Sequence, residues 1–201
     1  MSQPQAYPLT IRGELTEPLS RWLWIFKWFL GIPHFFLLAC LWIATFVVTI
    51  IAFFAIVFTG KYPKSIFQFV VGVLRWSWRV GFWSYQALGT DKYPPFSFES
   101  RADYPADLNV EYPDKLSQGW VWIKWWLLVI PHYIVLWFFV GSRNSPGLVE
   151  VLAIFAGIGV LFTGKYMPDF FKFVMGMNRW SYRVFSYALL LTDKYPPFSM
   201  D

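Results

Sequence analysis

The stretch Phe58-Thr59-Gly60-Lys61-Tyr62 occurs a second time, as Phe162-Thr163-Gly164-Lys165-Tyr166. Three further blocks recur in the same order: Pro33-His34 as Pro131-His132, Arg75-Trp76-Ser77-Trp78-Arg79-Val80 as Arg179-Trp180-Ser181-Tyr182-Arg183-Val184, and Asp91-Lys92-Tyr93-Pro94-Pro95-Phe96-Ser97 as Asp193-Lys194-Tyr195-Pro196-Pro197-Phe198-Ser199. Matched blocks in one order indicate a tandem duplication of roughly 100 residues. We therefore predict two repeats, residues 1–100 and 101–201, and each predicted element must fit both.

The composition is that of a membrane protein. Hydrophobic residues make up 57% of the 201 residues and charged residues 14%, against roughly 25% charged in soluble domains. Residues 35–58 carry no charge and exceed the ~20 residues that a helix needs to span a bilayer. The 13 tryptophans and 11 tyrosines gather beside the apolar runs, as they do at membrane–water interfaces. The net charge of +5 comes without a nucleic-acid-binding motif, which favours anionic lipid over nucleic acid as the partner.

Each repeat is predicted to cross the membrane as a helical hairpin. As one straight helix the apolar block 21–59 would reach ~58 Å, about twice the ~30 Å hydrocarbon core. The equivalent block of the second repeat is interrupted by turn-forming residues, Gly141-Ser142-Arg143-Asn144-Ser145-Pro146-Gly147. We therefore expect an all-α membrane protein whose spans lie at about residues 22–42, 45–59, 120–140 and 148–163.

The basic residues orient these hairpins. Every lysine and arginine except Arg143 then lies on one side of the membrane or at its boundary. The positive-inside rule places that side, with both termini, in the cytoplasm, so we expect a multi-pass protein of the inner (plasma) membrane. The alternative topology makes 35–58 and 65–88 single spans. It would put Arg75 and Arg79 near the bilayer centre, at roughly 2.5–3.5 kcal/mol each.

Under the hairpin topology, segments 65–88 and 169–190 are amphipathic helices in the cytoplasmic interface. Polar and small residues share one helical stripe in each segment: Gln68, Gly72, Arg75 and Arg79 in the first, and Lys172, Gly176, Arg179 and Arg183 in the second. Such helices sink their apolar side into lipid and direct cations to headgroup phosphates. The expected lipid-headgroup contacts are Lys61, Arg75, Arg79, Lys165, Arg179 and Arg183.

Two lead-in segments, 9–15 and 108–112, are the candidate strands because both alternate apolar and polar residues. They either pair as a small cytoplasmic sheet or form irregular linkers bounded by proline. The sequence leaves both interpretations open.

His34 and His132 are the only histidines, and each follows a repeated proline inside an apolar run. The preferred interpretation is structural: proline kinks the helix, and the histidine bonds a carbonyl that the proline leaves unpaired. The alternatives are a proton relay and a pair of haem ligands, one from each repeat. The single cysteine, Cys40, excludes a multi-thiolate metal site, and we expect no cofactor or metal.

The blocks FTGKYP (58–63), GVLRWSWRV (72–80) and TDKYPPFS (90–97) resemble those of a family of bacterial integral membrane proteins described as a domain of unknown function. The chain resembles a two-copy member over essentially its whole length. The second repeat departs from the pattern in Met167, in Asn178 and in its longer turn. The resemblance implies a membrane location and supplies no activity or catalytic residues.

The expected function is that of a non-enzymatic membrane protein, an accessory or scaffold that associates with lipid headgroups and with other membrane proteins or itself. No base, nucleophile or metal-ligand pattern points to an enzyme. One alternative is a small transporter or channel with a site at the repeat interface. A second is a haem- or proton-handling protein that uses His34 and His132.

Overall fold

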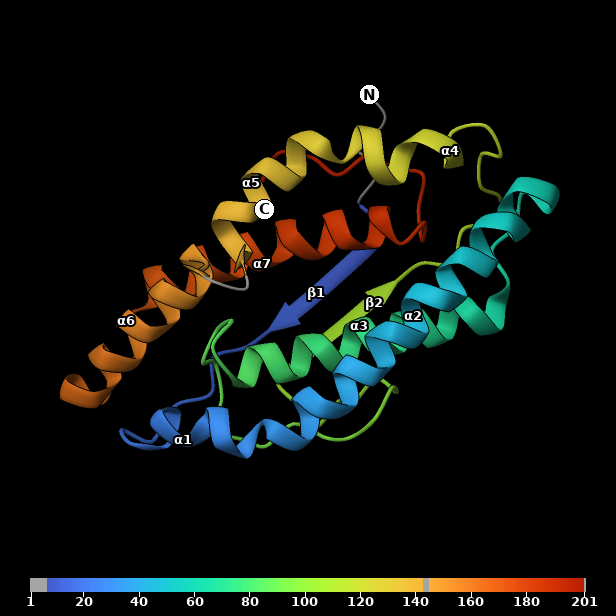
Figure 1. Ribbon diagram of the computed structural model, residues 1–201. Coiled ribbons are helices and arrows are strands. Elements are labelled where there is room, and N and C mark those ends of the chain that lie inside the picture. Colours follow the sequence, from blue (N-terminus) through green and yellow to red (C-terminus); the bar gives the residue numbers. More distant parts are fainter. Residues whose placement is uncertain (1–6, 143–144, 201) are drawn as a thin grey trace, which may run out of the picture.

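The computed structural model describes residues 7–142 and 145–200, of which helices form the larger part (Figure 1). The first repeat contains α1 (Leu23–Leu30), α2 (Ile32–Thr59) and α3 (Lys64–Trp83). The second contains α4 (Val121–Ile123), the π-helical turn η1 (Lys124–Leu128), α5 (Ile130–Val140), α6 (Leu148–Thr163) and α7 (Pro168–Ala188). The strands are β1 (Leu9–Gly13), β2 (Ala106–Val110), β3 (Gly141–Ser142) and β4 (Ser145–Pro146).

The first apolar block is not a hairpin. α2 is one uninterrupted helix of 28 residues, so the predicted spans 22–42 and 45–59 are wrong. Thr45, at the predicted turn, is buried in the middle of this helix, and residues 34–59 contain neither glycine nor proline to end it. The length argument failed because it assumed one straight path, whereas the block divides earlier, at Gly31 between α1 and α2.

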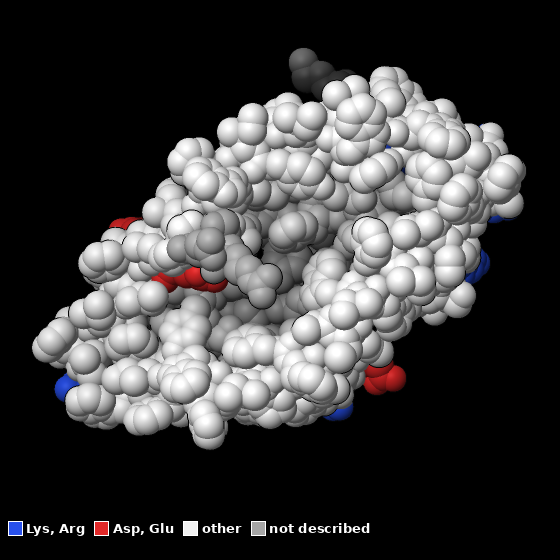
Figure 2. All heavy atoms as spheres, in the orientation of Figure 1, with Lys and Arg blue, Asp and Glu red and all other residues white. Residues whose placement is uncertain are grey.

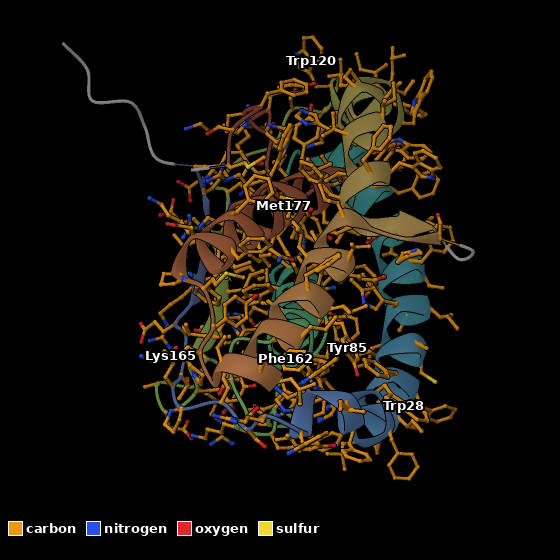
Figure 3. All side chains as sticks on the ribbon, turned by 90° about the vertical axis from the view of Figure 1, so that its left-hand side faces the viewer. Trp28, Tyr85, Trp120, Phe162, Lys165 and Met177 are labelled. Atoms are coloured by element: carbon orange, nitrogen blue, oxygen red, sulfur yellow. The ribbon has the colours of Figure 1, made fainter. Side chains whose placement is uncertain are left out.

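The second apolar block is interrupted by the predicted polar turn, but it does not fold back either. α5 and α6 run in the same direction as each other, one after the other, and both pack against α7. Strands β3 and β4 project from the junction of α5 and α6 (Figures 1 and 3). The turn is therefore an insertion into the counterpart of α2 and not the tip of a hairpin. Arg143, expected on the far side of the membrane, lies outside the described residues.

The helices predicted at 65–88 and 169–190 exist as α3 and α7, but they are central and not interfacial. α3 packs between α2 and β2, and α7 packs against α5, α6 and β1. Trp78 and Phe82 of α3 are fully buried, as are Val174 and Val184 of α7. The apolar sides that we assigned to lipid thus form the protein's own core.

The two lead-ins pair as an antiparallel sheet, which decides between the two interpretations left open. Leu9 lies opposite Val110, and Gly13 lies opposite Ala106. Each strand precedes the helices of one repeat and packs on the last helix of the other repeat. β1, before the first repeat's helices, packs on α7, and β2, before the second repeat's helices, packs on α3. The repeats are therefore interlocked around a shared core that includes Leu9, Leu108, Val70 and Val174.

The surface divides into two unlike sides. Most exposed large hydrophobic side chains of the described residues belong to α1, α2, α4, η1, α5 and α6, and we call this side the apolar face. Figure 2 shows few charged residues on it; most of them lie along its rim, and a group of acidic side-chain atoms also appears inside the face. The sheet and α7 lie on the opposite side from α2 in Figure 3. We call that side, formed by β1, β2 and the exposed parts of α3 and α7, the polar face.

Among the described residues, one helix of the apolar face has the length and composition of a membrane span, and one bent pair of helices has them only when counted as a single span. α2 is long and apolar enough by itself. The segment Val121–Leu128 qualifies only together with Ile130–Val140, from which it is bent by 45°.

Candidate functional site

The polar and aromatic residues of the repeated blocks gather in two equivalent clusters, each at the start of one repeat's apolar helices. The first cluster consists of Lys27, His34, Trp76, Trp83, Asp91, Tyr93 and Phe96. The second consists of Lys124, His132, Trp180, Tyr187, Asp193, Tyr195 and Phe198. The recurrence of the same contacts in both repeats shows that these blocks carry one local structure.

A buried lysine–aspartate pair joins the DKYPPF block to the start of the apolar helices. Lys27 is 1% exposed, and its Nζ lies 3.0 Å from Asp91 Oδ1. The same Nζ donates to the Thr90 carbonyl at 2.6 Å and lies over the Trp83 ring. Asp91 also accepts the backbone N–H of Ser20. A charged lysine in an apolar helix is thus neutralised and hydrogen-bonded, as burial of a charge requires.

The second repeat reproduces this pair. Lys124 Nζ lies 2.5 Å from Asp193 Oδ1 and donates to the Thr192 carbonyl at 3.2 Å. Asp193 accepts the backbone N–H of Ser117 at 2.6 Å. Lys124 is also 1% exposed, so both apolar blocks hold their lysine inside the protein.

The π-helical turn η1 accommodates one extra residue in the second repeat. Lys27 precedes His34 by seven residues, whereas Lys124 precedes His132 by eight. A π-helical turn holds one residue more than an α-helical turn, and η1 begins at Lys124. Both the lysine and the histidine therefore stay on the buried side despite the altered spacing.

Each histidine is held by a tryptophan and a phenylalanine of its own repeat. Trp76 Nε1 donates to His34 Nδ1 at 3.0 Å, and Trp180 Nε1 donates to His132 Nδ1 at 3.0 Å. His34 also stacks on Phe96, with ring centroids 3.9 Å apart. Because Nδ1 accepts a hydrogen bond, the neutral ring carries its proton on Nε2. Nε2 is buried without a hydrogen-bond partner in either ring, and the backbone of Pro94 or Pro196 lies close enough to each histidine to interact with it electrostatically.

These contacts favour the structural interpretation of the histidines but correct its details. Pro33 and Pro131 do not kink a helix from within, because each lies in the first turn of α2 or α5, a position that tolerates proline. Both rings are 0% exposed. The first turns of α2 and α5 lie on opposite sides of the molecule (Figures 1 and 3). The fold therefore does not bring the two histidines together, as shared haem ligation would require.

Arg79 points into the protein, so its predicted contact with lipid headgroups is wrong. Its guanidinium is 0% exposed and donates to the carbonyls of Ser97 and Glu99 and to Asp107 Oδ1, the last at 3.2 Å. Burial lowers the pKa of Arg79, and the nearby Asp107 opposes that shift. Arg79 thus attaches residues 97–99 and β2 to α3.

Arg75 has a similar role at a more open position. Its Nε donates to the Leu108 carbonyl at 2.7 Å, and its Nη1 donates to the Phe98 carbonyl at 2.6 Å. Its side chain keeps 12% exposure, and most of its hydrogen-bonding capacity is directed at the protein.

The other predicted headgroup residues differ in exposure. Arg183 is half-buried and donates to the Ser199 carbonyl at 3.2 Å. Arg179 is half-buried, and Lys61 and Lys165 are exposed. Contact of these residues with lipid stays a prediction.

The FTGKY blocks end the apolar helices and connect the repeats. Gly60 and Gly164 adopt left-handed φ values of 69° and 74° at the helix ends, as expected for C-terminal glycines. The tyrosine that follows each glycine reaches the other repeat. The Tyr62 hydroxyl donates to the Leu189 carbonyl at 3.4 Å, and the Tyr166 hydroxyl donates to the Ala87 carbonyl at 2.9 Å.

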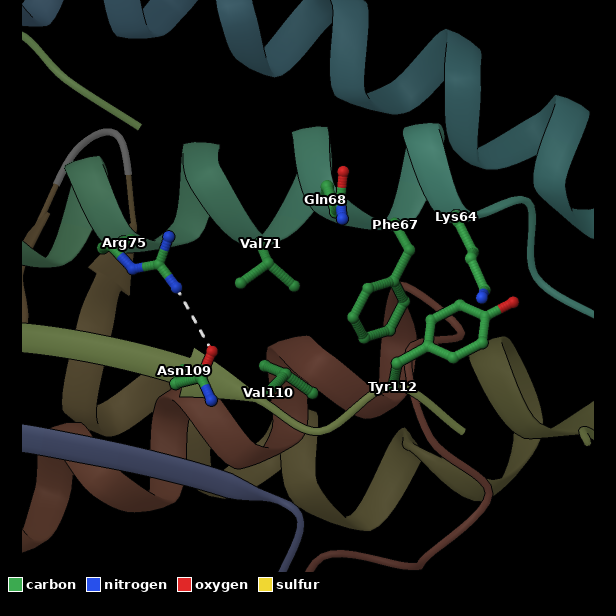
Figure 4. A pocket seen from close by; sticks show the side chains of 8 residues that line it. All are labelled: Lys64, Phe67, Gln68, Val71, Arg75, Asn109, Val110 and Tyr112. Carbon is green, nitrogen blue, oxygen red and sulfur yellow. Dashed lines mark hydrogen bonds between the residues drawn. The ribbon is translucent and has the colours of Figure 1, made fainter. Parts of the chain in front are cut away.

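Three cavities bear on possible binding sites. A cavity of about 40 Å³ at the repeat interface is lined by residues that include Gln86, Glu150 and Asn178, and it has room for water but not for a larger solute. A groove of about 390 Å³ lies between α3 and β2 (Figure 4). A third, of about 270 Å³, is lined by β1 and residues 102–105. Among the described residues, no group of three or more His, Cys, Asp and Glu side chains is placed to hold a metal ion.

Sequence reasoning missed the two lysine–aspartate pairs and the tryptophans that hold the histidines. A signal for the lysines was present. Lys27 and Lys124 are the only charged residues of segments 22–59 and 120–140, and each precedes the Pro-His pair by nearly the same distance. Their aspartates are far away along the chain, so the pairing itself requires the fold.

Comparison with known proteins identifies a family. No curated protein and no solved structure matches the chain. A family model described as "Domain of unknown function (DUF4389)" matches residues 21–97 and again residues 120–200. The two matched segments contain both clusters and both FTGKY blocks, and together they cover more than half of the chain. The chain therefore belongs to the DUF4389 family, whose domain it matches in two successive segments.

Proposed function

We propose that this chain is a non-enzymatic integral membrane protein, an accessory or scaffold subunit that immerses its apolar face in lipid. Its polar face would meet water and bind other membrane proteins or further copies of the chain. The observation that carries the proposal is the segregation of the surface into an apolar and a polar face (Figures 2 and 3). Among the described residues, the helices of the apolar face contain three charged side chains. Lys27 and Lys124 are buried and paired, and Glu150 is half-buried.

The size of the apolar face supports immersion in lipid. More than twenty large hydrophobic side chains on it are exposed, including Phe36, Phe46 and Phe58. Burying one such side chain is worth about 1.5–3 kcal/mol, so the face as a whole represents tens of kcal/mol. Monomeric soluble proteins rarely expose contiguous apolar patches beyond a few hundred Å². A lipid environment accounts for this surface without further assumptions.

The position of the polar face supports an orientation in which α2 and α5–α6 lie parallel to the plane of the membrane. In Figure 3 the sheet lies at mid-height between the ends that carry Trp28 and Trp120. Arg12, Glu14 and Glu111 in and beside the sheet are exposed. If α2 crossed the bilayer along its normal, these charges and the open sheet edges would lie near the bilayer centre, where neither is stable. With α2 and α5–α6 in the membrane plane, they face water.

We therefore propose that the apolar face enters one leaflet of the inner membrane, with both termini in the cytoplasm. Lysines and arginines outnumber acidic residues in the chain, which favours the anionic cytoplasmic surface. Strands β3 and β4 project on the apolar side. They pair with each other, which lowers the cost of placing their backbone in lipid.

The use of the ionisable residues supports a non-enzymatic role. Lys27 with Asp91, Lys124 with Asp193, and Arg79 with Asp107 join distant segments of the chain. The polar atoms that pair them are directed at the protein and not at a large cavity. These residues therefore stabilise the fold that presents the two faces.

Two single-cysteine variants in a Cys40→Ser background test the immersion. Arg21→Cys and Lys61→Cys lie at opposite ends of the α1–α2 segment, and both native residues are exposed. In intact cells, an impermeant maleimide should label neither, and both should react after the inner membrane is opened. Labelling of one position from outside would mean that α2 crosses the bilayer, and the one-leaflet proposal would fail.

A second experiment tests the accessory or scaffold role. Native mass spectrometry of the chain purified in mild detergent should show bound lipid together with self-association or a membrane-protein partner. A monomer without lipid or partner, at concentrations where the fold is intact, would contradict the proposed role.

A further inference from the structure

We propose that the groove between α3 and β2 binds a phosphate group, carried by a lipid headgroup or by a free phosphate compound. The groove has a volume of about 390 Å³, within the roughly 300–1,000 Å³ of ligand pockets. Figure 4 shows its lining side chains, Lys64, Phe67, Gln68, Val71, Arg75, Asn109, Val110 and Tyr112. None of them is acidic. This binding site is independent of the scaffold role.

Among the lining residues and their ion-pair partners, cations outnumber anions. Arg75 Nε and Arg79 Nη2 each lie 3.2 Å from the same carboxylate oxygen, Asp107 Oδ1. Two guanidinium groups therefore share one negative charge. Lys64 adds a third cation, and it has no ion pair within residues 7–142 and 145–200. An anion in the groove would supply the missing charge.

Hydrogen-bond donors line the same groove. Asn109 Oδ1 accepts a hydrogen bond from Arg75 Nη2 at 3.2 Å (Figure 4), so the Asn109 amide group keeps both N–H donors for another partner. The exposed amide of Gln68 lies one helical turn after Lys64. Lys64 is the first residue of α3, where the helix dipole favours an anion, and its Nζ lies 5.6 Å from the centre of the Tyr112 ring.

The floor of the groove is apolar. Phe67, Val71 and Val110 are buried and lie beneath the polar side chains. A ligand that fits therefore combines a phosphate with a short apolar part. A phospholipid headgroup with its first methylenes meets this description, and so does a phosphorylated small molecule.

The second repeat does not reproduce the polar lining residues of the groove on α3 and supplies a matched control. Pro168 occupies the position of Lys64 in α7, and Lys172 occupies the position of Gln68. Lys172 is exposed on α7, like Lys64 on α3, but it does not line the groove. Lys172→Gln thus removes the same charge from a similar surface without touching the groove.

The test measures binding to the full-length chain in detergent and in nanodiscs. The probes are inorganic phosphate, phosphatidylglycerol and phosphatidylcholine, and the variants are Lys64→Gln, Gln68→Glu and Lys172→Gln. We expect Lys64→Gln to weaken binding of the phosphate-bearing probe about fivefold to tenfold, as the loss of one charge-assisted contact does. Gln68→Glu should weaken it at least as much by repulsion. Lys172→Gln should change it less than about twofold.

The probes separate the two sources of phosphate. Binding of inorganic phosphate that competes with lipid indicates a site open to free compounds, and retention of phosphatidylglycerol alone indicates a headgroup site. The proposal is overturned if no probe binds, or if both groove variants bind like the unmodified chain while melting at the same temperature. Equal weakening by Lys172→Gln would also overturn it, because binding would then follow net charge and not the groove.

Discussion

The lysine–aspartate pairs predict an asymmetry between two substitutions at one ion pair. Asp91→Asn removes the negative charge and leaves the Lys27 ammonium 1% exposed, with only uncharged acceptors, the Thr90 carbonyl and the new amide oxygen, beside it. Lys27→Met removes the buried charge and keeps an unbranched side chain of similar volume. It leaves Asp91, whose side chain is 25% exposed and still accepts the Ser20 N–H. Asp91→Asn leaves a buried charge without its counter-charge, and Lys27→Met does not.

The magnitude follows from these burials. Removing one partner of a fully buried pair costs about 3–5 kcal/mol. Because Asp91 borders water, screening reduces the interaction and we expect a loss of about 2–3 kcal/mol for Asp91→Asn. An apolar replacement of a buried charge is often nearly neutral, so Lys27→Met should cost less than about 1 kcal/mol. For a chain of this size 1 kcal/mol corresponds to roughly 2–4 °C in melting temperature.

Thermal unfolding in mild detergent measures both variants and their combination. Asp91→Asn should lower the melting temperature by about 4–12 °C, and adding Lys27→Met should restore most of the loss. Lys124→Met and Asp193→Asn should show the same order in the second repeat. If the lysine variant proves as destabilising as the aspartate variant, or the double variant is the least stable, then the unpaired buried charge is not the cause of the destabilisation.

Three further predictions concern the histidines, the helix ends and the buried tyrosines. Trp76→Phe leaves His34 Nδ1 buried without its hydrogen-bond donor, so the free energy of unfolding should fall by about 1–3 kcal/mol. The control Trp122→Phe, at an exposed site, should change the free energy of unfolding by about 0.5 kcal/mol at most. Equal effects of the two variants in denaturant titrations would refute the role of the hydrogen bond. Gly60→Ala places a Cβ at φ 69° and should cost about 1–2 kcal/mol, measured by circular dichroism against Gly119→Ala, where no atom obstructs a Cβ. Burial raises the pKa of Tyr7 to about 12, so its contribution to stability is complete below pH ~10, the unfolded value, and is lost as the pH rises toward 12. Tyr7→Phe should therefore flatten the fall in stability over that interval, and an unchanged slope would show that the phenol does not contribute.

Local signals in the sequence predicted much of the fold. The tandem blocks predicted the repeat. The predicted segments 45–59 and 148–163 end at the residues where α2 and α6 end. The alternation of apolar and polar residues in the two lead-ins made a small sheet one of the two interpretations. The turn formers at 141–147 correctly located the break between α5 and α6. Each of these features depends on residues that are neighbours along the chain, which is why pattern and propensity sufficed.

The errors have a common origin in contacts between distant segments. The hairpin prediction used apolar length, which measures how far a block can reach but not where it bends. The stripe with Arg75 and Arg79 was read as facing headgroups because nothing nearby in sequence covers it. The covering atoms come from residues 97–99 and from β2. Lys27 and Asp91 are likewise separated by more than sixty residues, so neither residue alone identified the pair.

The crossed packing of β1 on α7 and of β2 on α3 bears on how such a chain arose. In a polypeptide with a single repeat, the helix equivalent to α3 or α7 would lack the strand that covers it. The leading strand of that polypeptide would likewise lack the helix on which it packs. Two such polypeptides would resolve this by exchanging their leading segments, which makes an intertwined homodimer the natural ancestor of the present chain. Duplication and in-frame fusion of its single gene would then have replaced a concentration-dependent assembly by an intramolecular one.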